Sequence, residues 1–453
     1  MHTSLAANAR NAITLHAVTA RGARAFLARQ KRGGLLTATG FTGAAGQLAA
    51  MPDLKGGVAA WVLGLGEGKD HFALAAAAEK LPAGTYKLGE VPAMQADNNA
   101  ALGWLMGGYH FGRYKENDKK PVRLVTPPGV DAAEITRIAE SLFLARDLIN
   151  TPANDMGPAE LEAAARAVAK QHGAKVRVVS GAALARDYPL IAAVGQGSER
   201  APRLIELVWG KGPLVTLVGK GVCFDTGGYD LKPASGMLLM KKDMGGAATV
   251  LAVAGMAMGA KLNMRLRVLI PAVENSVSGN AIRPGDVFKS RKGLTVEIGN
   301  TDAEGRLILA DALADADDEA PELLIDVATL TGAARVSTGM ELPPFFTDDE
   351  ALAADLARIG TAQQDPLWRL PLWRGYEDTL SSRIADLNNN PAYSFAGAIT
   401  AALFLNRFVG KAKVWAHLDI PGWIDRAKPG RPLGGEANAA RTLYALLKER
   451  YAR

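Results

Sequence analysis

The stretch Asn300-Thr301-Asp302-Ala303-Glu304-Gly305-Arg306 carries two carboxylates and a guanidinium at alternate positions, between two different secondary-structure patterns. The β-branched run at 294–298 predicts a strand, and the apolar run at 307–313 predicts a helix. Because residues two apart in an extended segment point to the same side, we expect Asp302, Glu304 and Arg306 to face one pocket. The alternative is that these acids only stabilise the dipole of the helix, and this stretch alone does not exclude it.

A second polar stretch, at 218–248, follows a strand predicted at 214–218 and leads into an alanine-rich helix predicted at 247–258. It contains two pairs of adjacent glycines, which mark loops where the backbone passes close to another group or adopts a positive φ. We expect four charged residues to lie on these loops: Lys220, Asp225, Lys232 and Asp243. Ligands of open α/β sheets bind beyond the carboxyl ends of the strands, so these side chains are predicted to border a site.

The two stretches together supply one amine and four carboxylates: Lys220, Asp225, Asp243, Asp302 and Glu304. Four carboxylates cannot share one pocket without cations, because like charges a few ångströms apart repel strongly. Two divalent ions about 3.5–4 Å apart are a known solution, and such a pair acts as a clamp for hydrolysis. A lysine ligates a metal only as the neutral amine, so the ions would have to lower the pKa of Lys220.

Both stretches resemble the cytosolic leucyl aminopeptidases, which are hexameric two-metal peptidases. Residues 300–307, NTDAEGRL, match the family signature, and 218–248 match its other metal-binding block with the same internal spacing. The resemblance covers roughly residues 150–453. It implies a metalloaminopeptidase of peptide catabolism that hydrolyses the N-terminal residue, with leucine or other apolar residues favoured, by means of a metal-activated water. It further implies two Zn²⁺ or Mn²⁺ ions per subunit, bicarbonate as the general base, and a homohexamer.

The same resemblance implies roles for individual residues. Asp225 and Glu304 would bridge the two ions, and the remaining metal ligands would be Lys220, Asp243 and Asp302. Lys232 would stabilise the tetrahedral oxyanion and Arg306 would hold the bicarbonate. The substrate would be contacted by Met240, Asn300, Thr329 and Gly332. The alternative for Arg306 is a salt bridge to one of the nearby acids, and the alternative for Met240 is an ordinary core position.

The chain departs from the family pattern at two loops that border the substrate pocket in the family. Pro391-Ala392-Tyr393 stands where the family usually has Gly-Gly-Arg. After Asp419 the chain continues Ile420-Pro421-Gly422-Trp423, where a Gly-Thr-Ala-Trp-like turn is typical. These departures concern the choice of N-terminal residue and leave the metal ligands unchanged.

The predicted elements indicate an α/β fold in which a small N-terminal α/β domain is joined by a long helix to a larger catalytic domain. We place the boundaries at 1–130, 131–150 for the linker helix, and 151–453. Asp131, with Glu134 three residues later, is a good N-cap for this helix. Beyond it, helices alternate with strands predicted at 175–179, 204–208, 214–218, 264–270 and 323–327. This alternation favours a mostly parallel sheet flanked by helices.

Composition limits the classes of function. Of the 453 residues, 48% are hydrophobic, and the net charge of +6 comes from scattered lysines and arginines, which disfavours a nucleic-acid partner. The one cysteine, Cys223, excludes an intrachain disulfide and suits a reducing cytoplasm. The apolar runs are too short for a signal peptide or a membrane span, so we expect a cytoplasmic protein.

Two features of the sequence suggest alternatives to the aminopeptidase. A phosphate-binding loop at Gly219-Lys220-Gly221 is disfavoured, because such a loop needs Ser or Thr after the lysine at a helix start. The same fold with an added DNA-binding or regulatory role stays open, and salt-dependent binding of DNA would reveal it.

Overall fold

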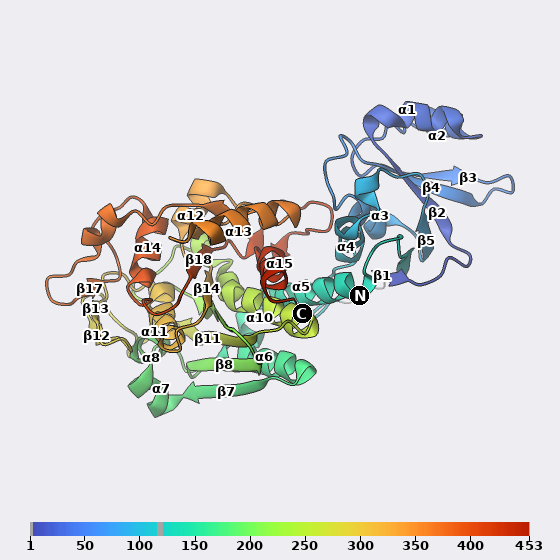
Figure 1. The fold of residues 1–453 in the computed structure, drawn as a ribbon. Coiled ribbons are helices and arrows are strands. Elements are labelled where there is room, and N and C mark those ends of the chain that lie inside the picture. Colours follow the sequence, from blue (N-terminus) through green and yellow to red (C-terminus); the bar gives the residue numbers. More distant parts are fainter. Residues whose placement is uncertain (1–2, 116–120, 453) are drawn as a thin grey trace. The chain divides into compact units, whose positions relative to one another are not determined.

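The computed structural model describes residues 3–115 and 121–452, drawn in Figure 1. The chain divides into two compact units, the first up to Phe143 with Arg426–Leu433, the second Leu144–Asp425 with Gly434 onward. The division falls within helix α5 (Ala132–Asn150), the helix predicted at 131–150. The sequence also predicts a charged loop at 115–120, and all of it except Lys115 lies outside the described residues.

The first unit is built on a six-stranded sheet in the order β1-β6-β5-β2-β4-β3, in which only β3 is antiparallel to its neighbour. Its strands are β1 (Thr3–Ala6), β2 (Ile13–Val18), β3 (Leu48–Pro52), β4 (Val58–Gly64), β5 (Gly84–Leu88) and β6 (Val122–Val125). Its helices are α1 (Ala20–Arg29), α2 (Gly33–Ala38), α3 (Leu74–Lys80), the 3-10 turn η1 (Ala93–Gln95) and α4 (Asn98–Met106). The sequence predicts a helix over 100–114 that breaks at Gly107-Gly108, and α4 ends at this break, where a Cβ on Gly107 would lie 2.6 Å from Ala75 O.

The second unit contains a nine-stranded sheet in the order β16-β15-β18-β14-β9-β11-β8-β7, with β10 also paired to β11. The central strands run parallel, while β7, β8 and β15 are antiparallel to a neighbour. The strands are β7 (Lys175–Ser180), β8 (Arg203–Gly210), β9 (Leu214–Gly219), β10 (Gly221–Asp225), β11 (Arg265–Asn275), β14 (Leu323–Ala328), β15 (Pro344–Phe346), β16 (Trp368–Arg369) and β18 (Trp415–Asp419). The predicted mostly parallel sheet is therefore confirmed.

Helices cover both faces of this sheet (Figure 1). One side carries α6 (Pro158–His172), α10 (Gly245–Gly259), α13 (Glu350–Ala362) and α15 (Ala440–Tyr451). The other side carries α8 (Pro189–Gly195), α11 (Glu304–Asp318) and α14 (Gly397–Asn406). Nearly every residue of α10 is buried, as expected for a helix that is apolar all round. These layers leave the carboxyl ends of the central strands as the edge where polar residues gather.

The remaining elements are short. They include helices α7 (Gly181–Asp187), α9 (Ala234–Met237) and α12 (Gly332–Thr338), and the 3-10 turns η2 (Ala153–Asp155), η3 (Met240–Met244) and η4 (Arg374–Leu380). The strand predicted at 294–298 is β13 (Thr295–Glu297), which belongs to a separate sheet with β12 (Val287–Lys289) and β17 (Leu387–Asn388). A two-stranded sheet pairs β19 (Trp423–Ile424) with β20 (Gly434–Gly435). Within the described part of the chain, we find no helix with both the length and the apolarity needed to cross a membrane.

Lys220 lies at an interruption between β9 and β10, two strands that both pair in parallel with β11. Its backbone N–H donates to Val327 O at 3.0 Å, and its carbonyl accepts from Ala247 N at 2.9 Å. The prediction that Asp225 lies on a loop is wrong, because the chain re-enters the sheet after Lys220 and Asp225 is the last residue of β10. The lysine is thus held by its backbone between a neighbouring strand and the start of α10.

Candidate active site

The candidate site lies where the central strands of the second unit end. Lys220 follows β9, Asp225 ends β10, and Thr329 follows β14. Asp243 comes from η3 and Glu304 from the first turn of α11, and both are buried. The expectation that the polar residues of the two motifs meet beyond the strand ends is thereby met in the structure.

Lys220 binds two of the carboxylates at once. Its Nζ lies 2.8 Å from Asp243 Oδ2 and 2.9 Å from Glu304 Oε1, and it donates to Thr329 O at 3.1 Å. Burial of the side chain opposes its charge, but the two neighbouring carboxylates outweigh that effect and raise the pKa of Lys220 above its ordinary value. Without metal ions the amine is therefore protonated and neutralises part of the acidic cluster.

Lys232 binds the other two carboxylates. Its Nζ lies 2.8 Å from Asp225 Oδ2 and also forms an ion pair with Asp302. Burial again opposes the charge, and the attraction of Asp225 outweighs it and raises the pKa of Lys232. The second oxygen of Asp225 accepts hydrogen bonds from Gly227 N at 2.9 Å and from Asn275 Nδ2 at 2.8 Å, so both oxygens of this carboxylate have partners.

The carboxylates are close enough to share a cation. One oxygen each of Asp225, Asp302 and Glu304 lies within 4.8 Å of the others. Burial, together with the charge of Asp225, raises the pKa of Glu304 well above its ordinary value and that of Asp302 to about 6. Glu304 Oε1 is buried, and its ion pair with Lys220 is not accompanied by a hydrogen bond from the described residues. Hard oxygen donors gathered in a buried cluster fit divalent metal ions.

The predicted geometry of the NTDAEGR stretch is wrong in one respect. Helix α11 begins at Glu304 rather than at Leu307, so Glu304 and Arg306 are helical and not extended. Residues two apart on a helix point in directions about 200° apart, and the two side chains separate. Arg306 Nη1 donates to Asn389 O at 2.7 Å, and the described part of the chain contains no ion pair between Arg306 and either Asp302 or Glu304. Burial lowers the pKa of Arg306 to about 10.

Two of the four residues expected to contact the substrate, Thr329 and Asn300, bond to residues of the cluster. Thr329 is buried, and its Oγ1 donates to Asp243 Oδ1 at 2.8 Å. Asn300 Oδ1 accepts from Asp302 N at 2.7 Å and shapes the turn before α11. Gly332 is exposed at the start of α12, whereas Met240 is buried in η3. The burial of Met240 suits both a pocket wall and a core position.

Several residues that organise the site were missed from the sequence. Asn275, at the end of β11, donates to Asp225, and Asp419, at the end of β18, accepts from Leu330 N at 2.9 Å and from Thr331 Oγ1 at 2.6 Å. A polar residue that ends an apolar strand was the available signal for both. Asn389 lies in a run of three asparagines, which marks a turn and does not indicate its partners.

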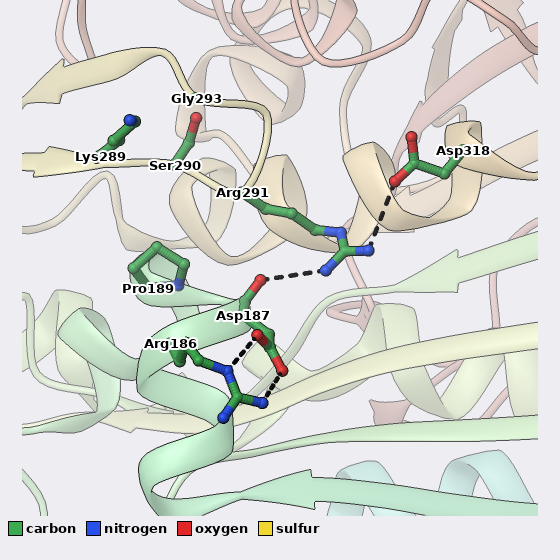
Figure 2. Close-up of a pocket in the computed structure, with 8 residues that line it drawn as sticks. All are labelled: Arg186, Asp187, Pro189, Lys289, Ser290, Arg291, Gly293 and Asp318. Carbon is green, nitrogen blue, oxygen red and sulfur yellow. Dashed lines mark hydrogen bonds and ion pairs between the residues drawn. The ribbon is translucent and has the colours of Figure 1, made fainter.

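The structure also has a cavity of about 710 Å³ away from these residues, shown in Figure 2. Arg186 donates to both carboxylate oxygens of Asp187 there, at 2.8 and 2.7 Å. Arg291 donates to Asp187 O at 3.3 Å and contacts Asp318 at 3.5 Å. The arginines and aspartates that line the cavity thus bind one another, and none of the candidate metal ligands lines it.

Lysines and carboxylates buried together at the carboxyl edge of a mostly parallel sheet are the arrangement expected of a metal-dependent hydrolase of the α/β class. Comparison with protein families places the chain within that class. Residues 143–444 match the cytosol aminopeptidase family, catalytic domain, and residues 25–127 match the M17 aminopeptidase N-terminal domain. The chain belongs to the cytosol aminopeptidase family, and it is accordingly a peptidase that acts as an aminopeptidase.

Individual relatives agree with this assignment. Proteins named probable cytosol aminopeptidase are 38% identical over 464 aligned residues in Leifsonia xyli subsp. xyli (95% of this chain, 92% of that protein) and 42% identical over 381 in Syntrophotalea carbinolica (79% and 76%). The crystal structure of cytosol aminopeptidase from Coxiella burnetii matches with a TM-score of 0.94 at 42% identity over 99% of both chains. The bottromycin maturation enzyme BotP in complex with Mn matches with a TM-score of 0.88 at 34% identity, covering 97% of this chain and 99% of that one. The predicted family, fold class and enzyme class are confirmed, and the family is metal-dependent.

Proposed function

We propose that this aminopeptidase uses two divalent ions, Zn²⁺ or Mn²⁺, to remove leucine or another apolar residue from the amino end of peptides with a metal-activated water. The observation that carries the proposal is the buried cluster in which Lys220 contacts Asp243 and Glu304 while Asp225 and Asp302 lie beside them. When bound, such ions lower the pKa of a coordinated water and polarise the peptide carbonyl.

Five residues would hold the ions, with Asp225 and Glu304 between the two sites and the remaining ligands supplied by Lys220, Asp243 and Asp302. Lys220 must then release the proton that the carboxylates now stabilise, because a protonated amine has no lone pair to donate. Metal binding is therefore coupled to proton release and should strengthen as the pH rises.

Two further residues are assigned to the chemistry. The Lys232 ammonium, held at the edge of the carboxylates, would stabilise the negative charge that develops on the carbonyl oxygen. Arg306 would hold a bicarbonate that acts as the general base. In support, Arg306 Nε is buried and has no partner among the described residues, so a donor is available for an anion.

The first side chain of the peptide would lie among Met240, Thr329 and Gly332, with Asn300 as a further contact to the substrate. A thioether, a threonine methyl and a glycine form an adaptable apolar surface. This composition favours leucine-like side chains over charged ones.

Removal of metal tests the proposal directly. After exhaustive chelation, hydrolysis of an N-terminal peptide library should fall to background, because the carboxylates without ions cannot supply the activated water. Adding back Zn²⁺, Mn²⁺ or Co²⁺ separately should restore it, and cleaved peptides should be enriched in leucine and other apolar residues at the first position. Full activity in protein that metal analysis shows to be free of ions would contradict the proposal.

We also propose that the chain forms a homohexamer in the cytoplasm. The support is the resemblance to a hexameric family, the cytosolic names of the relatives, and a single buried cysteine. Closed symmetry of this kind is common among enzymes. Sedimentation at micromolar protein should give the mass of six chains, and a monomer alone would count against it.

A further inference from the structure

Lys232, the proposed oxyanion stabiliser, lies on a segment that the core does not hold. The chain leaves the sheet at Asp225, the end of β10, and is next buried at Met240 in η3. No residue from 229 to 239 is buried, and Leu238 is 77% exposed. The position of Lys232 therefore depends on polar contacts rather than on packing.

These contacts are made by Thr301, the fully buried residue before Asp302. Thr301 N donates to Asp230 Oδ2 at 2.7 Å, and Asp230 N donates to Thr301 Oγ1 at 2.9 Å. The Thr301 hydroxyl in turn donates to Gly227 O at 2.6 Å and lies 3.1 Å from Asp230 Oδ2. A Cβ on Gly228 would lie 2.9 Å from Thr301 Oγ1, so the backbone passes directly against the threonine. We call the reciprocal bonds between Asp230 and Thr301 the clasp.

The clasp lies next to the ion pair of Lys232 with Asp302. Lys232 follows Asp230 by two positions, and Asp302 follows Thr301 by one. Among the described residues of 226–239, only the side chains of Asp230 and Lys232 bond to the NTDAEGR stretch. A hydrogen bond from a backbone N–H to a carboxylate is charge-assisted and stronger than a neutral one. The Asp230 carboxylate thus ties the exposed segment to the acidic cluster.

We infer that Asp230 is a positioning residue, which holds the Lys232 ammonium where it meets the developing oxyanion. The inference rests on the proposed function, in which Lys232 stabilises that charge. Side chains on loops are placed less precisely than those on helices or strands, and they depend on supporting hydrogen bonds. Misplacement of a reacting group by about 1 Å can cost about 10²-fold in rate.

The stretch that carries Asp302 has anchors besides the clasp. Asn275 Nδ2 donates to Thr301 O at 3.1 Å, and α11 begins two residues after Asp302, at Glu304. The exposed segment has no comparable support from the core. Loss of the clasp should therefore displace Lys232 more than Asp302, and lower the rate without loss of metal.

The test measures kcat, KM and metal content of full-length, metal-loaded variants with a leucyl peptide. Asp230→Ala should lower kcat about 10- to 100-fold, because the ammonium is no longer held in place. It should keep two bound ions and a near-parental KM, because the charge on the oxyanion develops only during attack. Asp230→Asn can still accept from Thr301 N through its amide oxygen, so it should lose less activity than Asp230→Ala.

The chain offers a matched control in Asp386, which forms the same arrangement with Thr295. Thr295 N and Oγ1 donate to Asp386 Oδ2 at 2.8 and 2.7 Å, and Asp386 N donates to Thr295 Oγ1 at 2.9 Å. Asp230 and Asp386 are both exposed. Within the described chain, neither Asp386 nor Thr295 bonds to Lys232 or to a candidate metal ligand. Asp386→Ala should therefore keep the parental kcat.

A double variant shows whether Asp230 acts through the lysine. In the Lys232→Ala background, Asp230→Ala should change kcat by less than about twofold, because the group that it positions is gone. Losses that multiply, fewer bound ions in Asp230→Ala, or an equal loss in Asp386→Ala would each overturn the inference. If Lys232→Ala lowers kcat and Asp230→Ala does not, only this inference fails. If Lys232→Ala keeps the parental kcat, the proposed role of Lys232 fails and the inference fails with it.

Discussion

Glu304→Gln should lower kcat for a leucyl peptide by more than about 10²-fold, which exceeds the 10–100-fold typical of residues that only support a metal ligand. Glutamine keeps the shape of the side chain and removes the charge that we assign to both ions. Without metal, the melting temperature of Glu304→Gln should be no lower than that of the metal-stripped parent. The reason is that burial and Asp225 raise the pKa of Glu304, so its ionisation in the folded state costs stability that a neutral amide does not.

Asp243→Asn should also lose metal and lower kcat, because Asp243 Oδ2 lies 2.8 Å from Lys220 Nζ in the same cluster. The matched control is Asp311→Asn, the same change at a buried carboxylate further along α11. Asp311 accepts from Leu190 N at 2.7 Å and Arg291 N at 2.8 Å, away from the cluster. Asp311→Asn should lower the melting temperature and keep both ions and near-parental kcat. Parental rates in Glu304→Gln, or equal metal loss in the control, would refute the assignment.

Lys232→Ala should keep two ions bound and lower kcat by about 10²–10³-fold, the usual effect of removing one transition-state donor. Binding of a short peptide in the ground state should change far less, because the charge that Lys232 meets develops only during attack. Lys220→Ala should instead weaken metal binding, since its amine is assigned as a ligand. Metal content and kinetics of the two purified variants provide the measurement.

The structure sharpens this comparison, because each lysine contacts two carboxylates: Lys220 binds Asp243 and Glu304, and Lys232 binds Asp225 and Asp302. The two variants therefore remove equal numbers of ion pairs and serve as controls for each other. If Lys232→Ala loses metal while Lys220→Ala keeps it, the two roles are exchanged.

The sequence was sufficient to predict the structure wherever a local pattern of residues determines it. The apolar runs at 214–218 and 323–327 form β9 and β14. The adjacent glycines mark a close contact of the backbone, since a Cβ on Gly246 would lie 2.1 Å from Val327 O. Because parallel strands end at one edge, the meeting of Lys220 with Thr329, which follow β9 and β14, could be expected from these elements.

The sequence was insufficient where tertiary contacts decide. An acidic residue stabilises the first turn of a helix, and α11 therefore begins at Glu304, although alternate charges also suit an extended segment. Asn389 was missed because its contact with Arg306 spans 83 positions of the chain. No local pattern reports such a contact, since it depends on how β17 brings the asparagine beside α11.

Gly305 places a constraint on how this enzyme can evolve. A Cβ at that position would lie 2.5 Å from Lys220 Cε and 2.6 Å from its Nζ. The lysine stem is flexible, so the fold would tolerate alanine there, but the amine would have to leave Asp243 and Glu304. Positions 220 and 305, far apart in sequence, are therefore epistatic: a lineage that keeps the lysine must keep the glycine, and one that loses the lysine becomes free to vary both.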